Sequence, residues 1–89
     1  MKLINIGFGN LVNAEKVMAV VNPDGAPVKR LVAKAKEEGT AVDATQGRRT
    51  KAVLILDNGT ILLSALQPET IGRRVSPDLG LQEEKEENE

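Results

Sequence analysis

Cysteine, histidine, tryptophan and tyrosine are all missing from this 89-residue chain, and Phe8 is its only aromatic residue. Without cysteine no disulfide can form, and without cysteine and histidine the usual ligands of a zinc site are lacking. The same absence removes the commonest general base and the most reactive nucleophile of enzymes. We therefore expect a protein that is not an enzyme and that binds neither a metal nor a cofactor.

Long hydrophobic runs are also missing. A membrane-spanning helix needs roughly 20 consecutive apolar residues, and the apolar runs of this chain are far shorter. Met1 and Lys2 lead directly into a strand-like segment, without the features of a signal peptide. The sequence thus predicts a cytoplasmic protein with no membrane partner.

The charges divide the chain into two parts. Residues 1–77 carry eleven basic and seven acidic side chains, a net charge of +4, whereas residues 78–89 carry six acids and a single base, Lys85. A strongly charged segment with few apolar residues cannot bury enough surface to offset the entropy that it loses on ordering. We expect one basic domain over residues 1–77 and a disordered acidic tail over residues 78–89.

Hydrophobic patterning and breaker residues predict the element order β-β-α-β-β-β-α. The first two strands are close in sequence, which favours a hairpin or meander, and Asn58-Gly59 is the preferred pair for a two-residue turn between strands. The predicted fold class is α+β, a small and mostly antiparallel sheet with one central helix and a short C-terminal helix. Strands are expected at residues 2–8, 16–21, 40–45, 50–56 and 60–66, and helices at residues 27–38 and 69–75.

The central helix has the clearest pattern. Pro27 suits its first turn, and Gly39 suits a left-handed end. Between them, apolar residues follow the i, i+3, i+4, i+7 spacing of one buried helix face. These residues are Val28, Leu31, Val32 and Ala35.

The strands after this helix are apolar on both faces. Residues 52–56 and 61–63 contain no polar side chain, so both faces of the sheet must be covered. The central helix, about 18 Å long at a rise of 1.5 Å per residue, covers one face only. The other face meets either the C-terminal helix or further copies of the chain. The amount of apolar surface favours self-assembly, because obligate interfaces resemble a domain core.

A basic connection precedes the strand at residues 50–56. Its sequence, Gly47-Arg48-Arg49-Thr50-Lys51, places three cations beside a hydroxyl. Guanidinium groups pair bidentately with phosphates and with guanine edges, and Thr50 can donate to a phosphate oxygen. Plain solvated charge remains the alternative. Since aromatic stacking platforms are missing, phosphate binding here favours duplex DNA over single-stranded nucleic acid.

Other polar residues show no spacing typical of a catalytic or metal site. Asp43, Asp57 and Glu69 suit solvated strand ends and a helix start, and Ser64 suits a small residue inside an apolar strand. The segment Gly7-Phe8-Gly9-Asn10 lacks the third glycine of a dinucleotide-binding loop. A turn is the favoured interpretation.

Four motifs resemble the RemA family of extracellular-matrix regulators. They are INIGFGN at residues 4–10, APVKR at 26–30, DATQGRRT at 43–50 and SALQPET at 64–70. The resemblance covers about residues 2–74. It implies a bacterial, nucleoid-associated transcriptional regulator that activates biofilm-matrix or stress-related operons. It also implies LytTR-like subunits in a ring-shaped homo-octamer around which double-stranded DNA wraps.

The resemblance also implies site residues. The DNA-contacting arginine pair of the family falls on Arg48 and Arg49. A third basic contact falls on Lys16, which keeps the charge of the family's arginine but loses its bidentate fork. Thr50 and Lys51 complete the expected DNA-binding set, with no catalytic residue and no metal ligand.

Three alternatives stay open. The first is a ring scaffold whose arginine loop meets an acidic protein partner. It is also compatible with a sensor of a small phosphorylated ligand, which needs a pocket that the sequence does not indicate. The acidic tail either mimics DNA at the arginine loop or keeps the protein soluble.

Overall fold

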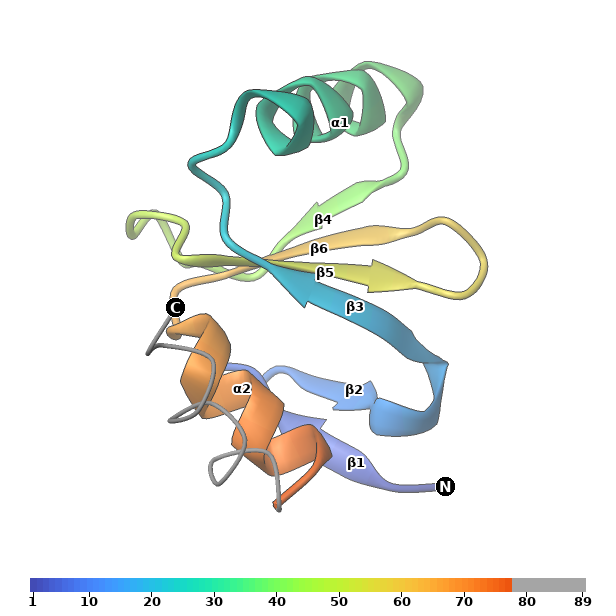
Figure 1. The fold of residues 1–89 in the computed structure, drawn as a ribbon, viewed down its shortest axis with the longest axis vertical. Coiled ribbons are helices and arrows are strands. Elements are labelled where there is room, and N and C mark those ends of the chain that lie inside the picture. Colours follow the sequence, from blue (N-terminus) through green and yellow to red (C-terminus); the bar gives the residue numbers. More distant parts are fainter. Residues whose placement is uncertain (78–89) are drawn as a thin grey trace, which may run out of the picture.

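The computed structural model describes residues 1–77, and the expected acidic tail lies outside them. The chain forms six strands and two α-helices within this part, with a short 3₁₀ turn, η1, before β3 (Figure 1). The elements are β1 (Leu3–Asn5), β2 (Leu11–Asn13), η1 (Ala14–Lys16), β3 (Val17–Val21), α1 (Ala26–Glu38), β4 (Ala41–Asp43), β5 (Ala52–Leu56), β6 (Ile61–Ser64) and α2 (Pro68–Val75).

A four-stranded sheet forms the centre of the fold, in the order β3-β5-β6-β4. β5 pairs antiparallel with β3 and with β6, whereas β4 runs parallel to β6 at one edge. The parallel pair arises because α1 carries the chain from β3 at one edge to β4 at the other (Figure 1). The predicted α+β class and both predicted helices are confirmed.

The predicted pairing of the first two strands is wrong. Leu11–Asn13 forms β2, a strand that the sequence analysis did not predict, and β2 pairs with β1 in a separate two-stranded sheet. β3 pairs with β5 instead. β1 and β2 have only three residues each, too few to show an alternation of apolar and polar residues in the sequence. The turn between them begins at Gly7.

The hairpin turn between β5 and β6 also differs from the prediction. The Leu56 N–H donates to the Thr60 carbonyl at 3.0 Å, so the loop has three residues, Asp57 to Gly59, rather than two. Within it only Gly59 has a positive φ, of 90°. This is the three-residue hairpin loop with a left-handed glycine after the turn, not the two-residue loop, which needs positive φ at both central residues.

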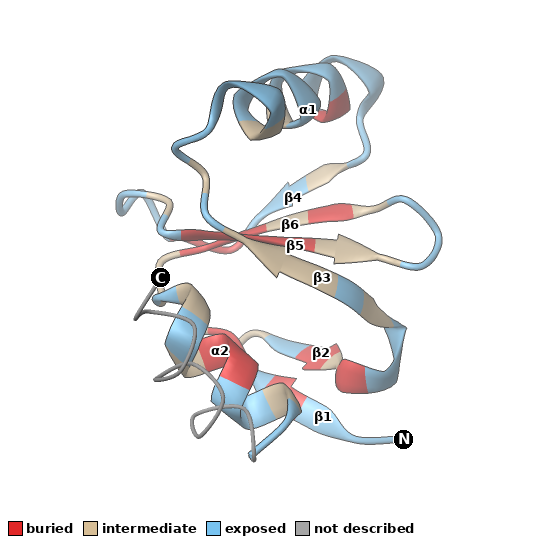
Figure 2. Ribbon diagram, viewed as in Figure 1, coloured by how far each residue is buried: buried red, intermediate tan, exposed pale blue. Residues whose placement is uncertain are grey.

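The two faces of the four-stranded sheet are covered by different elements of the same chain. α1 lies over one face, and α2 with the β1–β2 hairpin lies over the other (Figure 1). On the α1 side, Ala35 packs against Val53 and Leu63. On the opposite side, Ile71 of α2 is fully buried in one cluster with Leu54 and Ile4. Figure 2 shows the buried residues gathered along β5, β6 and the inner side of α2.

The coverage by α2 confirms one of the two explanations for the apolar strands. Since both faces are covered within one chain, self-assembly loses this basis and stays a prediction. On α1 the predicted buried face is confirmed at Ala35, which is buried in the core cluster, and at Val28 and Val32, which are partly buried and pack against it. Leu31 is 38% exposed, so its assignment to that face is wrong.

Some apolar side chains remain outside the core of the described chain. Leu3 and Leu11 are 52% and 59% exposed, because their strand neighbours Ile4 and Val12 point inward. Leu11 lies opposite Asn5, two residues from Leu3, so the two leucines are diagonal neighbours on the outer face of the hairpin. We call this pair the outer leucine patch.

Candidate nucleic-acid interface

The basic residues lie on the connection between β4 and β5, residues 44–51. The connection crosses one end of the sheet because β6 lies between the two strands, so it is longer than the four residues predicted. At its tip the Arg48 N–H donates to the Thr45 carbonyl at 2.9 Å. Gln46 and Gly47, between them, have φ values of 54° and 79°. Two consecutive positive φ values indicate a type I′ turn, and the connection that contains it extends beyond the strands of the sheet (Figure 1).

An acidic side chain braces the start of this loop. One carboxylate oxygen of Asp43 accepts hydrogen bonds from the Thr45 backbone N–H at 2.8 Å and from the Thr45 hydroxyl at 2.6 Å. The hydroxyl bond first, and then the backbone bond, lowers the pKa of Asp43 below its ordinary value. Thr45 itself is buried. Asp43, expected to be a solvated strand end, therefore fixes the base of the basic loop.

A second turn lies beside the first. The Asn10 N–H donates to the Gly7 carbonyl at 3.0 Å, and Phe8 and Gly9 have φ values of 55° and 77°. This segment is therefore a turn, as predicted. The Asn10 side-chain amide donates to the Gly7 carbonyl at 2.9 Å and reaches the Ala44 carbonyl at 3.5 Å. Asn10 thus joins this turn to the base of the basic loop.

Ser64 gives this corner of the molecule a buried anchor. Its hydroxyl donates to the Ile6 carbonyl at 2.7 Å and accepts from the Leu66 N–H at 3.0 Å. Ser64 has no exposed surface. It joins the end of β1, the end of β6 and the segment before α2. Ser64 was expected only as a small residue inside an apolar strand, but its hydroxyl also forms two hydrogen bonds.

The cations of the loop are exposed and lack acidic partners. Arg48, Arg49 and Lys51 form no ion pair within residues 1–77. The guanidinium carbon of Arg48 lies 5.9 Å from the centre of the Phe8 ring, within the roughly 6 Å reach of a cation–π contact. These side chains are available to an anion of another molecule.

Two hollows flank these cations. The larger, of about 420 Å³, lies between the Phe8 turn and the basic loop, and Phe8, Leu66 and the three cations line it. The smaller, of about 170 Å³, is lined by Arg49, Thr50, Lys51 and polar residues from two neighbouring segments, among them Asp24 and Gln67. Arg49 and Lys51 border both hollows. Because Asp24 lines the smaller hollow and no acidic residue is among those that line the larger one, the larger hollow suits an anionic group better.

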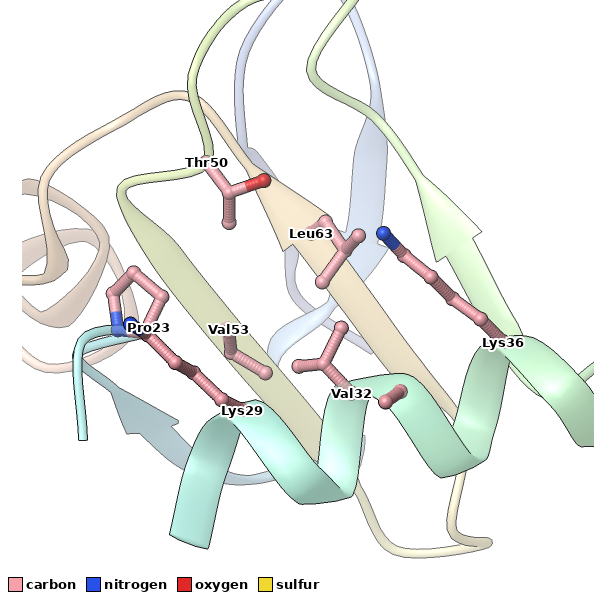
Figure 3. A pocket seen from close by; sticks show the side chains of 8 residues that line it. Pro23, Lys29, Val32, Lys36, Thr50, Val53 and Leu63 are labelled. Atoms are coloured by element: carbon pink, nitrogen blue, oxygen red, sulfur yellow. The ribbon is translucent and has the colours of Figure 1, made fainter. Parts of the chain in front are cut away.

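A third hollow, of about 280 Å³, lies between α1 and the sheet (Figure 3). Lys29 and Lys36 extend from α1 along its rim, and Thr50 lies at one end. Its floor is apolar, and the floor residues Val53 and Leu63 are 0% and 2% exposed. A ligand therefore reaches little of the floor, and the polar groups of this hollow, Lys29, Lys36 and Thr50, lie around its rim.

The predicted site residues do not all come together. Arg48, Arg49, Thr50 and Lys51 share the loop end of the sheet. Lys16 lies at the other end, where its ammonium group is 3.6 Å from a carboxylate oxygen of Asp57 in the β5–β6 turn. Sequence reasoning missed Phe8 as a partner of Arg48. The Gly-Phe-Gly pattern signalled a tight turn but not which loop would lie next to it.

The described part of the chain shows no metal site and no membrane span. Within residues 1–77 no three or more acidic side chains gather as potential metal ligands. Neither helix in this part is long and apolar enough to cross a bilayer.

Residues 3–75 match the model of the RemA-like family, described as extracellular matrix regulatory protein A-like. A protein of Lachnoclostridium phytofermentans is 60% identical over 75 residues, covering 84% of this chain and 82% of the relative. One of Acetivibrio thermocellus is 57% identical over 76 residues, covering 85% and 82%. One of Cyanothece sp. is 55% identical over 74 residues, covering 83% and 81%. All three carry the name of a regulatory protein.

Proposed function

Because this chain belongs to the RemA-like family, whose matched relatives are named regulatory proteins, we propose that it is a transcriptional regulator that binds double-stranded DNA. In this proposal it acts as a ring-shaped homo-oligomer of LytTR-like subunits, of which eight form the ring. It activates biofilm-matrix or stress-related operons and is associated with the nucleoid. The family names support a regulatory role rather than an enzyme, and the residues below support DNA as the target.

One observation carries the DNA-binding proposal. Arg48, Arg49 and Lys51 extend from one loop, are exposed, and have no acidic partner within residues 1–77. A loop that served only solubility gains nothing from keeping three cations together, because like charges repel one another. Phosphates of a duplex remove this repulsion and release condensed counterions. The net charge of +4 over residues 1–77 supports the same target.

Two points support self-assembly: the outer leucine patch, and the stronger DNA binding that several arginine loops on one assembly would give. One loop neutralises few phosphates, so its contact with DNA is weak and sensitive to salt. Several loops held on one ring act together through effective concentration. Leu3 and Leu11 provide exposed apolar surface for contacts between copies. The alternative partner, an acidic protein bound to the same loop, is distinguished by whether generic duplex DNA competes with it.

The test of DNA binding is a pair of arginine variants with a matched control. Arg48→Ala and Arg49→Ala are each expected to abolish binding to a promoter-length duplex in a gel-shift assay, while the mass in solution is unchanged. At low salt, where weak binding is still measurable, each variant lowers the slope of log K against log salt by about 0.9 for each engaged subunit. Arg30→Ala, which removes an exposed α1 arginine without an ion pair in residues 1–77, keeps normal binding. Normal binding by the Arg48, Arg49 double variant would refute the proposal.

The test of assembly uses the outer leucine patch. Leu11→Glu is expected to reduce the mass measured by light scattering, because it places a charge in an apolar contact. Leu31→Glu, on the exposed side of α1, serves as the control and leaves the mass unchanged. A wild-type protein that is a single subunit in solution would contradict the ring.

A further inference from the structure

Phe8 lies in an unfavourable place for the only aromatic residue of the chain. It is 52% exposed at the tip of a turn, and its φ of 55° is in the left-handed region that non-glycine residues avoid. Burial of the ring does not compensate for this strain, since half of the residue is in solvent. Strain that the fold itself does not require is typical of functional positions.

The contacts of Phe8 lead to the basic loop. The Arg48 guanidinium carbon lies 5.9 Å from the ring centre. The two turns that carry these residues are held together from below, because the Asn10 amide donates to the Gly7 carbonyl at 2.9 Å and reaches the Ala44 carbonyl at 3.5 Å. The backbone that carries the ring is therefore fixed relative to the loop that carries Arg48.

We propose that Phe8 is a positioning residue for the DNA contact. Its ring holds the Arg48 guanidinium at the side of the 420 Å³ hollow, where Arg49 and Lys51 also contribute charge, so that a backbone phosphate of the duplex finds the cations already placed. This inference rests on the proposed function and adds to it a residue without charge. Phe8 acts through Arg48 and not by contacting bases.

The expected effect follows from conformational freedom. A free arginine loses rotamer freedom when it binds phosphate, and an arginine already held by a ring loses less. At an exposed site a cation–π contact corresponds to about a two- to fivefold change in Kd for each engaged subunit. Because no charge is removed, the number of released counterions stays the same.

The first experiment compares three substitutions of Phe8 by measuring duplex binding over a range of salt. Phe8→Leu and Phe8→Asn are expected to weaken binding about two- to fivefold for each engaged subunit, with an unchanged salt slope. Phe8→Tyr keeps the ring and binds like the wild type. Asparagine tolerates positive φ well, so Phe8→Asn separates the loss of the ring from any folding defect. A reduced salt slope, or unchanged binding by both ring-less variants, would overturn the inference.

A double-mutant cycle decides whether Phe8 acts through Arg48. At low salt, Phe8→Leu is expected to have no further effect on Kd when Arg48 is already alanine. Additive effects would mean that the ring contacts DNA directly, and would overturn the positioning role. If the Phe8→Asn protein had a different mass in solution, the Phe8 side chain would take part in contacts between copies of the chain. That result would also overturn the positioning role.

A measurement without DNA separates this inference from the proposed function. In NMR spectra of the free protein, the Arg48 side-chain protons are expected to show the ring-current shift of an aromatic neighbour, which Phe8→Leu removes. Absence of that shift overturns the inference even if the wild type binds DNA. If the shift is present but the wild type does not bind a duplex, the proposed function fails, and the positioning role in DNA binding fails with it.

Discussion

The two ends of the four-stranded sheet are built in contrasting ways. At the hairpin end, the left-handed position of the loop is a glycine, Gly59, and the nearby cation Lys16 is paired with Asp57 at 3.6 Å. At the loop end, Phe8 and Gln46 occupy left-handed positions although they are not glycine. The cations of that end have no acidic partner within residues 1–77.

This contrast separates what folding requires from what it only tolerates. Glycine at a left-handed position and a paired surface charge cost the fold little. A non-glycine residue at such a position costs about 1–2 kcal/mol, and neighbouring unpaired cations repel one another. Such costs persist where function needs them, because stability alone would remove them. The loop end is therefore the end of the molecule at which we place its function.

The largest expected effect concerns the buried anchor of the loop end. Ser64→Ala leaves the Ile6 carbonyl without the hydroxyl that donates to it at 2.7 Å, in a place with no access to solvent. We expect a loss of about 1–3 kcal/mol in the free energy of unfolding, measured by urea denaturation. Ser76→Ala, at an exposed position after α2, is the control and changes stability by less than about 0.5 kcal/mol. Equal stability of the Ser64 variant and the wild type would mean that this bond does not hold the loop end.

The next prediction concerns two substitutions that remove backbone strain at the loop end and introduce it at the hairpin end. Gln46→Gly relieves a left-handed residue, and we expect it to stabilise the fold by up to about 1 kcal/mol, since the gain is reduced by the greater freedom of unfolded glycine. Gly59→Ala introduces the same strain at the hairpin end and is expected to destabilise by about 1 kcal/mol. Thermal and urea denaturation measure both changes. Destabilisation by Gln46→Gly would show that the Gln46 side chain makes a contact worth more than the strain.

Local patterns in the sequence predicted most of the elements correctly. The helix spacing from Val28 to Ala35 and the left-handed end at Gly39 place α1, and α2 begins at Pro68, one residue before the predicted start. The apolar segments give β5 and β6. These features depend on residues a few positions apart, which the sequence displays directly. The α+β class followed from their order.

Pairing between distant segments could not be predicted in the same way. β3 pairs with β5, some thirty-five residues later, and β4 lies parallel beside β6, because α1 carries the chain from one edge of the sheet to the other. The sequence indicated Arg48, Arg49, Thr50 and Lys51 by composition alone. Phe8 and Arg48 lie close together because Asn10 joins the two separate turns that carry them. No local sequence pattern predicts this proximity.

A smaller effect on stability and DNA affinity is expected when the ion pair between Lys16 and Asp57 at the hairpin end is removed. Asp57→Asn frees the Lys16 ammonium group and adds one positive charge at the end opposite the arginine loop. Because exposed ion pairs contribute little, the free energy of unfolding should change by less than about 1 kcal/mol. Duplex affinity at low salt should rise slightly, and Lys16→Ala should weaken binding less than Arg48→Ala does. If Lys16→Ala weakened binding as strongly as Arg48→Ala, the two ends would contribute equally to the DNA contact, and the contrast between them would fail.

The smallest effect is a dependence on pH at the base of the arginine loop. The hydrogen bonds from Thr45 lower the pKa of Asp43 in the folded state, so the carboxylate stabilises the fold fully above its unfolded pKa, near 3.8. That contribution is lost as the pH falls through the lower folded pKa. Between pH 6 and pH 2.5, the thermal midpoint of the wild type should therefore fall more than that of Asp43→Asn. The difference should be small because Asp43 is exposed, and parallel curves would mean that the carboxylate does not brace the loop. Such a result would leave the Asn10 amide, which reaches the Ala44 carbonyl at 3.5 Å, as the side chain that braces the base of the arginine loop.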